Sequence, residues 1–216
     1  MPDSPHTVSD VMTHTAIAVG RHAGYKEIVE LMEQWKVSAL PVIEGEGRVI
    51  GVVSEADLLP KEEYRSNDLT RADRPLSDAD AAKAGAVSAE ELMSAPAITV
   101  HASATIAEAA RIMARRHVKR LPVVDDVGML EGVVSRADLL KVFLRADEEI
   151  ADEIRRTVIE NLPVAQVEVS VTDGAVTLRG DLRDRALVPL LARAVRAVEG
   201  VVDIRLDLDS SAAHES

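Results

Sequence analysis

The sequence predicts a mixed α+β protein in which two copies of a β-α-β-β-α unit pack against each other and a smaller α-β-β-α-β domain follows. An internal repeat supports the first part, because Gly51–Leu59 matches Gly132–Leu140 at all but one position. The same offset aligns residues 12–59 with 93–140 without a gap, and a unit of this size would bury its apolar face against its twin. Strict alternation of apolar and polar residues at 167–171 indicates a strand of a further domain.

Each copy of the repeat shows the same order of elements. In the first copy we expect a strand at Ala16–Val19, a helix, strands at Leu40–Ile43 and Val49–Val53, and a second helix from about Ser54. The first helix should bury one stripe, made of Ile28, Leu31, Met32 and Trp35. Gly45 and Gly47 favour a turn between the two adjacent strands.

The third domain is predicted from its turns and helix signals. We expect a helix over Phe143–Ile159, a hairpin of strands 167–171 and 176–179, a helix from Pro189 to Gly200, and a last strand at Val201–Leu208. The Asp-Gly pair at 173–174 is typical of a tight hairpin turn.

These patterns divide the chain into five segments. They are a first repeat at 8–59, a charged connector at 60–86, a second repeat at 87–142, a third domain at 147–208 and a disordered tail at 209–216. A short helix is expected at Ala79–Ala84 within the connector.

The composition argues against several classes of protein. The 216 residues include 25 Lys and Arg against 37 Asp and Glu, a formal net charge of -12, with one Trp, two Tyr and one Phe. Nucleic-acid binding is therefore not expected, because it needs clustered cations and stacking aromatics. The absence of cysteine excludes disulfides and thiolate chemistry. With no apolar run at its start and none of about 18 residues elsewhere, we expect a soluble, cytoplasmic protein.

A Gly-h-h-Ser-x-x-Asp motif, where h is an apolar residue, occurs at Gly51–Asp57 and at Gly132–Asp138. Each copy falls where a strand leads into a helix, and a helix start suits a phosphate or a ribose hydroxyl. The Ser hydroxyl can donate there, the Asp carboxylate can accept from both ribose hydroxyls, and the glycine would let a ligand approach the backbone. The alternative is that each Ser-x-x-Asp is only a helix cap.

The two copies differ in charge over a short stretch. Five neutral or acidic residues of the first copy are replaced by Arg111, Arg115, Arg116, Lys119 and Arg120 in the second. The last two immediately precede a Leu-Pro-Val strand, where a phosphate could gain charge-assisted hydrogen bonds. For the arginines of the predicted helix, a solvent-facing surface is favoured over contact with a ligand.

Residues for catalysis or metal binding are not apparent. His14, His22, His101 and His117 are not spaced as metal ligands, and no nucleophile stands beside a base in any known motif. The acidic residues Asp125–Asp126 and Asp147–Glu149 are interpreted as solvated surface. We therefore expect no enzyme, no catalytic cofactor and no metal.

The doubled motif, together with the repeated Leu-Pro-Val and the segments Asp10–Met12 and Glu91–Met93, resembles a tandem CBS-domain pair, or Bateman module. The resemblance covers residues 8–140. Residues 152–208 resemble a BON domain, through Val169-x-Val171, the spaced glycines of Gly174–Gly180, and Val198–Val201. The order CBS-CBS-BON is similar to that of small stand-alone bacterial regulatory proteins.

The CBS resemblance implies a pseudo-twofold pair that commonly dimerises and binds adenosine-containing ligands such as AMP, ADP, ATP or S-adenosylmethionine. It implies that Asp57 and Asp138 hold ribose, with Ser54 and Ser135 beside the ribose or phosphate. It also implies adenine contacts from Val52, Val133, Ile17 and Ile98, and phosphate contacts from Lys119 and Arg120. Because Ser38 and Ala39 stand in place of these cations in the first copy, we expect unequal sites, with the stronger one combining Lys119 and Arg120 with Ser135 and Asp138.

Three functions fit these features. The leading interpretation is a non-catalytic adenosine-ligand sensor that signals through rearrangement of a homodimer and through the BON domain. A structural adaptor with vestigial pockets is the second, and an accessory subunit of a separate enzyme is the third. The BON resemblance implies a phospholipid surface as partner, but the net negative charge of its segment makes a protein partner at least as favourable.

Overall fold

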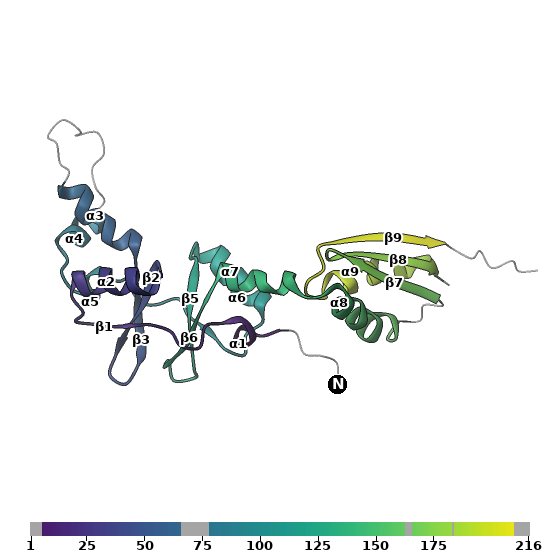
Figure 1. The fold of residues 1–216 in the computed structure, drawn as a ribbon, viewed down its shortest axis with the longest axis horizontal. Helices are drawn as coiled ribbons and strands as arrows, with labels where there is room; N and C mark the ends of the chain where they lie inside the picture. The colour runs from purple at the N-terminus through teal and green to yellow at the C-terminus, as the bar shows by residue number, and fades with distance from the viewer. Residues whose placement is uncertain (1–5, 66–77, 163–165, 183, 210–216) are drawn as a thin grey trace, which may run out of the picture. The chain divides into compact units, whose positions relative to one another are not determined.

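The structure, a computed structural model, describes residues 6–65, 78–162, 166–182 and 184–209 (Figure 1). These residues form two compact units. The repeat unit runs from Thr7 to Arg136, and the C-terminal unit contains the residues from Ala137 onward together with His6. Most of the expected disordered tail and the middle of the expected connector lie outside the described residues.

The two copies of the repeat fold alike. The first contains α1 (Val8–Val11), β1 (Val19–Gly20), α2 (Tyr25–Trp35), β2 (Ala39–Glu44), β3 (Arg48–Ser54) and α3 (Glu55–Arg65). After α4 (Asp78–Gly85), the second contains α5 (Ala89–Leu92), β4 (Val100–His101), α6 (Ile106–Arg116), β5 (Arg120–Val124), β6 (Leu130–Ser135) and α7 (Arg136–Leu139). The predicted β-α-β-β-α order is confirmed, with a short additional helix before each first strand.

Each copy forms its own three-stranded sheet. In the first, β1 runs parallel to β2 and β2 runs antiparallel to β3, and the second copy repeats this arrangement with β4, β5 and β6. The middle strands are almost fully buried because they carry the apolar Leu-Pro-Val segments.

The predicted stripe of α2 is only partly buried. Ile28 and Met32 lie in the core, whereas Trp35 is 51% exposed. The helix ends there because Lys36 adopts a left-handed conformation, with φ of 52°. This reversal brings Val37 against the core and leaves Trp35 outside it.

The two copies exchange their leading segments. Ser94, just before the first strand of the second copy, pairs with Val52 in β3, and Thr13 likewise pairs with Val133 in β6. A Cβ on Gly51 would collide with the side chain of Met93, and one on Gly132 would lie 2.7 Å from the carbonyl oxygen of Thr13. The expectation that these glycines admit a ligand is therefore wrong: the space beside them belongs to the exchanged segment of the other copy.

The C-terminal unit has the predicted α-β-β-α-β order (Figure 1). It contains α8 (Asp147–Ile154), β7 (Gln166–Thr172), β8 (Ala175–Asp181), α9 (Val188–Arg196) and β9 (Asp203–Asp209). β7 is antiparallel to β8, and β8 is parallel to β9, to which it connects through α9. Buried residues of both helices, among them Ile154 and Leu191, share one core with buried residues of the sheet such as Leu178.

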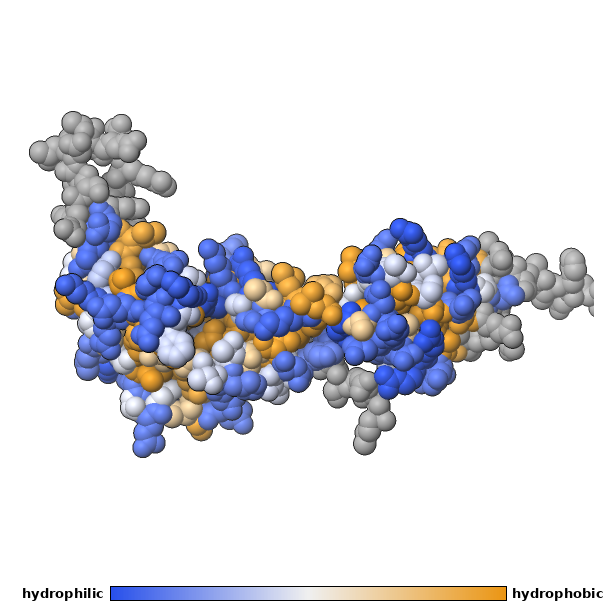
Figure 2. All heavy atoms as spheres, viewed as in Figure 1, coloured by the Kyte–Doolittle hydropathy of each residue, from blue (hydrophilic) through white to orange (hydrophobic). Residues whose placement is uncertain are grey.

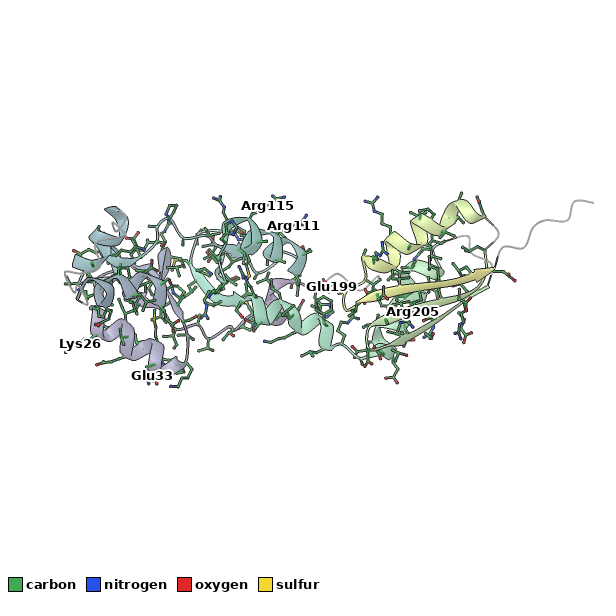
Figure 3. The ribbon with its side chains drawn as sticks, turned by 90° about the horizontal axis from the view of Figure 1, so that it is seen from above. Lys26, Glu33, Arg111, Arg115, Glu199 and Arg205 are labelled. Atoms are coloured by element: carbon green, nitrogen blue, oxygen red, sulfur yellow. The ribbon has the colours of Figure 1, made fainter. Side chains whose placement is uncertain are left out.

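The long helix predicted at Phe143–Ile159 is divided into three parts. Residues 140–144 form a 3-10 turn, Arg145 is extended, and α8 continues after Ile154 as a π-helical turn over Arg155–Ile159. The break places the Arg145 side chain 2.7 Å from the carboxylate of Glu153 and 2.9 Å from the carbonyl oxygen of Glu199. Glu199, which is marked in Figure 3, also accepts a hydrogen bond from the backbone N–H of His6.

Asp147 has a structural role that its acidic neighbours in the sequence do not indicate. Its carboxylate accepts hydrogen bonds from the N–H groups of Asp173 (2.8 Å) and Gly174 (2.9 Å), and both residues have positive φ, as the predicted tight turn requires. Asp147 is therefore not a simple surface acid, because it fastens the start of α8 to the hairpin.

Hydrophobic residues reach the surface at several places among the charged ones (Figure 2). The most exposed large residues include Leu59, Val87 and Val127 of the repeat unit and Leu140 and Leu144 of the C-terminal unit. None of the helices that the structure describes combines the length and apolar character needed to span a bilayer.

Candidate functional site

A cleft of about 450 Å³ opens in the repeat unit where the two copies meet. Its walls come from the start of β2, the end of β3, the start of α3, the segment before β4 and the start of β5. The volume falls in the range of small-molecule pockets, which mostly have apolar walls and a few convergent polar groups.

Six of the ten predicted binding residues line this cleft. They are Val52, Ser54, Asp57, Ile98, Lys119 and Arg120. The other four, Ile17, Val133, Ser135 and Asp138, are not part of its lining.

The predicted pairing of residues within the site is wrong. Lys119 and Arg120 were expected beside the second motif, but they face the first one, with Asp57. Arg120 shows why: its guanidinium donates a 2.9 Å hydrogen bond to the Ser38 hydroxyl, so its side chain extends toward the first copy. The exchange of leading segments also brings Ile98, from the second copy, to the same cleft.

Asp57 is the most constrained residue of the cleft. It is 7% exposed, and its Oδ2 accepts hydrogen bonds from the backbone N–H of Ser54 (2.8 Å) and the Ser54 hydroxyl (2.7 Å). Its Oδ1 forms an ion pair with Lys83 and lies 3.4 Å from the Ser94 hydroxyl. The motif is thus a helix cap through Oδ2, while Oδ1 points to partners outside the cap.

Helix α3, which carries Asp57, is held by its neighbours. The Tyr25 hydroxyl donates a 3.1 Å hydrogen bond to the Leu58 carbonyl oxygen. Burial, reinforced by the nearby Glu62, raises the pKa of Tyr25, so the phenol stays protonated as this donor. Lys61 lies 5.0 Å from the centre of the Tyr25 ring and donates to the carbonyl oxygen of Ala86, 2.8 Å away, beyond the end of α4. Helix α3 is therefore fastened both to α2 and to the connector.

The lining of the cleft combines charged, polar and apolar residues. Lys119 and Arg120 contribute positive charge, Glu55 contributes negative charge, and Val52 and Ile98 are apolar. The other cations of this region lie elsewhere: Arg111 and Arg115 project outward from α6 (Figure 3) and are exposed. This agrees with the interpretation of the helix arginines as a solvent-facing surface.

Two partners of Asp57, Ser94 and Lys83, were not predicted from the sequence. Ser94 had a signal, because the equivalent position of the first copy, Thr13, also carries a hydroxyl. Lys83 had none, since the connector has no counterpart in the repeat. Among the described residues, no cluster of three or more His, Asp or Glu side chains could hold a metal ion.

The sequence model of the CBS domain matches residues 8–62 and 89–145, about half of the chain. The chain belongs to the CBS domain family. The model of the BON domain matches residues 146–209, so the predicted CBS-CBS-BON order is confirmed.

Known proteins resemble this CBS protein over part of its length. An uncharacterised protein of Methanocaldococcus jannaschii is 29% identical over 134 residues, which are 55% of this chain and 80% of the relative. The chloroplastic CBS domain-containing protein CBSX2 of Arabidopsis thaliana is 29% identical over 160 residues, 67% of this chain and 66% of the relative. In two other archaeal relatives the match covers 31% and 59% of the relative's own length.

Solved structures share the fold of the repeat unit. The structure of CBSX2 in complex with AMP is 28% identical, covers 64% of this chain and 96% of its own, and has a TM-score of 0.52. The CBS pair of an M. jannaschii protein, in complex with 5'-methylthioadenosine and S-adenosyl-L-methionine, is 19% identical with a TM-score of 0.51, covering 65% of this chain and 97% of its own. The second likeness supports the fold alone.

Proposed function

We propose that this chain is a non-catalytic regulatory protein that binds an adenosine-containing ligand in the cleft. The observation that supports this most is the meeting of a buried carboxylate, Asp57, with Lys119 and Arg120 in one cavity with apolar walls. A homologue of similar fold, CBSX2, has been solved with AMP.

The chemistry of the cleft matches the three parts of such a ligand. Val52 and Ile98 provide apolar contacts for adenine, and the carboxylate of Asp57 can accept hydrogen bonds from the ribose hydroxyls. Lys119 and Arg120 supply charge-assisted donors for phosphate. These cations favour AMP, ADP or ATP over the positively charged S-adenosylmethionine.

The sites at the two motifs should differ in affinity for the ligand, as the sequence predicts. The stronger site, however, should be at the first motif and not at the second. Because the cations line the cleft of Asp57, we expect the first motif to provide the stronger site.

Calorimetric titration of the full chain tests this proposal. AMP, ADP, ATP and S-adenosylmethionine would be titrated into wild type, Asp57→Asn, Asp138→Asn and the double variant Lys119→Ala/Arg120→Ala. A hydrogen bond to a charged group contributes on the order of 1.5–3 kcal/mol, so Asp57→Asn should weaken binding at least about tenfold. The matched variant Asp138→Asn should leave the affinity of this site unchanged. The double variant should lower the affinity for phosphorylated ligands only.

Several outcomes would contradict the proposal. Two equivalent sites would contradict the predicted inequality, and an unchanged affinity in Asp57→Asn would remove Asp57 from the site. If folded wild type binds none of the four ligands, the structural adaptor becomes the better description. That alternative is supported by the bonds of Asp57 to Ser54 and Lys83, which satisfy its carboxylate without any ligand.

We further propose that ligand binding changes the arrangement of the two copies or of a homodimer, and that the BON domain conveys the change to a partner. A ligand can do this only through different affinities for two states, with a typical coupling of about 1–3 kcal/mol. Exposed apolar residues such as Val29 and Trp35 on α2 offer surface for self-association. Sedimentation of the chain with and without AMP would show whether a dimer forms and responds.

A further inference from the structure

The carboxylate proposed to bind ribose is already occupied by a lysine from outside the repeat. Lys83 lies in α4, and its ammonium pairs with Oδ1 of Asp57 across 26 positions of the chain. Both side chains are largely shielded, with exposed fractions of 21% for Lys83 and 10% for Asp57. An ion pair of this burial is not the loose contact expected between two surface side chains.

Asp57 has little hydrogen-bonding capacity left. An ionised carboxylate offers about four acceptor positions, two on each oxygen. The two on Oδ2 are filled by the N–H and the hydroxyl of Ser54, which start α3. The two on Oδ1 are taken by the Lys83 ammonium and, at 3.4 Å, by the Ser94 hydroxyl.

A ribose diol that donates two hydrogen bonds to Asp57 must therefore displace existing donors. Displacing Ser54 would break the cap of α3, whereas displacing Lys83 and Ser94 from Oδ1 leaves that helix start intact. The ribose and Lys83 compete for the same oxygen.

Displacement of Lys83 from Asp57 would remove a contact that holds the connector to α3. Helix α4 follows residues 66–77 and lies beside α3 (Figure 1). Two lysines fasten these parts together: Lys83 reaches from α4 to Asp57, and Lys61 reaches from α3 to the carbonyl oxygen of Ala86. The first of these contacts is lost when a ligand takes Oδ1, and the second is not.

We propose that Lys83 is a built-in competitor for the ribose of the ligand, and that ligand binding releases α4 from Asp57. Lys83 thereby lowers the affinity of the cleft for the ligand. Helix α4 of the connector loses its contact with Asp57 when the ligand binds. This inference rests on the proposed adenosine-ligand function.

The test compares two lysine-to-methionine variants of the full chain. Lys83→Met removes the competitor, while Lys61→Met removes the same charge from the same region without touching Asp57. Removing a charge-assisted competitor should tighten AMP binding in calorimetry about tenfold in Lys83→Met and leave it within about twofold of wild type in Lys61→Met. Circular dichroism would confirm that both variants fold.

Hydrogen exchange gives a second readout. In wild type, AMP should speed the exchange of the amides of residues 80–86, because α4 loses its contact with Asp57. In Lys83→Met these amides should already exchange fast, and AMP should change them little.

The outcomes separate this inference from the proposed function. If wild type binds AMP and Lys83→Met binds it equally or more weakly, Lys83 is not a competitor and the inference is overturned. If neither protein binds any of the four adenosine ligands, the proposed function fails and the inference fails with it. Binding by Lys83→Met alone would support the inference, because the lysine would then block the cleft of wild type, but the proposed function of the wild-type chain would fail.

Discussion

At the scale of single residues, identical motifs have acquired different neighbours. Asp57 and Asp138 occupy the same position of the repeat, yet Asp57 pairs with Lys83 of the connector and Asp138 with Lys141 one helical turn away, at 2.8 Å. Lys141 is 53% exposed in its side chain, so its pair with Asp138 lies closer to solvent than that of Asp57. The ion-pair partner of each motif aspartate is therefore a residue that has no equivalent lysine in the other copy.

Glu91 provides a prediction at this scale. Its carboxylate accepts hydrogen bonds from the N–H groups of Val87 (2.8 Å) and Ser88 (3.2 Å) before α5, and these bonds lower the pKa of Glu91. A lowered pKa in the folded state adds stability above the ordinary glutamate value of about 4.3, and this contribution disappears as the pH falls through the lowered pKa.

We therefore expect Glu91→Gln to be less stable than wild type at neutral pH and to match it in acid. Urea unfolding at a series of pH values, followed by the fluorescence of Trp35, would measure the difference. Trp35 is the single tryptophan of the chain and lies in α2, so its signal reports the repeat unit. A difference that does not change with pH would contradict the role of the charge.

At the scale of elements, the sequence predicted the order of helices and strands better than it predicted the contacts between their side chains. The repeat predicted the three strands and the order of elements in each copy, because the spacing of apolar residues in each strand and helix is a local property. It wrongly placed Trp35 in the buried stripe of α2, since the exposure of this side chain depends on a left-handed residue at the end of the helix. Nor did it show that Arg120 faces Asp57, because this follows from the exchange of segments between copies, which no local pattern records.

The exchange of segments leads to a prediction about the two motif glycines. A Cβ at Gly132 would meet the carbonyl oxygen of Thr13, whose backbone is fixed by its pairing with Val133, whereas a Cβ at Gly51 would meet the flexible side chain of Met93. Overpacking of a fixed neighbour costs about 1–3 kcal/mol, so Gly132→Ala should lower the free energy of unfolding by about that amount. Gly51→Ala should lower the free energy of unfolding by a smaller amount, because the Met93 side chain can change rotamer.

Urea unfolding followed by Trp35 fluorescence would compare these two variants as well. Equal losses, or a larger loss in Gly51→Ala, would mean that the exchanged segments are not held as the structure shows.

At the scale of the whole molecule, the chain consists of two units with separate cores. A core of the repeat unit contains Ile28, Leu40 and Leu92, and that of the C-terminal unit contains Leu178 and Leu191. Separate cores favour separate unfolding transitions, because each unit gains its stability from its own buried surface. A ligand of the cleft should then stabilise the repeat unit alone.

Leu191→Ala in α9 tests this independence. Leu191 is fully buried, and truncation of such a leucine costs about 2–5 kcal/mol. The midpoint temperature of the C-terminal unit should therefore fall, while that of the transition reported by Trp35 should not change. AMP at about 100 times its Kd should stabilise the repeat unit by about 2.7 kcal/mol in both proteins. Scanning calorimetry with parallel Trp35 fluorescence would assign each transition.

The same variant shows whether the BON domain conveys the ligand signal by itself. Coupling between two sites is reciprocal, so a BON domain that senses the cleft without a partner must change AMP affinity when it is destabilised. We expect the affinity of Leu191→Ala to stay within about twofold of wild type, because the two cores share no residue. Transmission would then require the partner to bind both units, and a larger change in affinity would instead place the coupling within this chain.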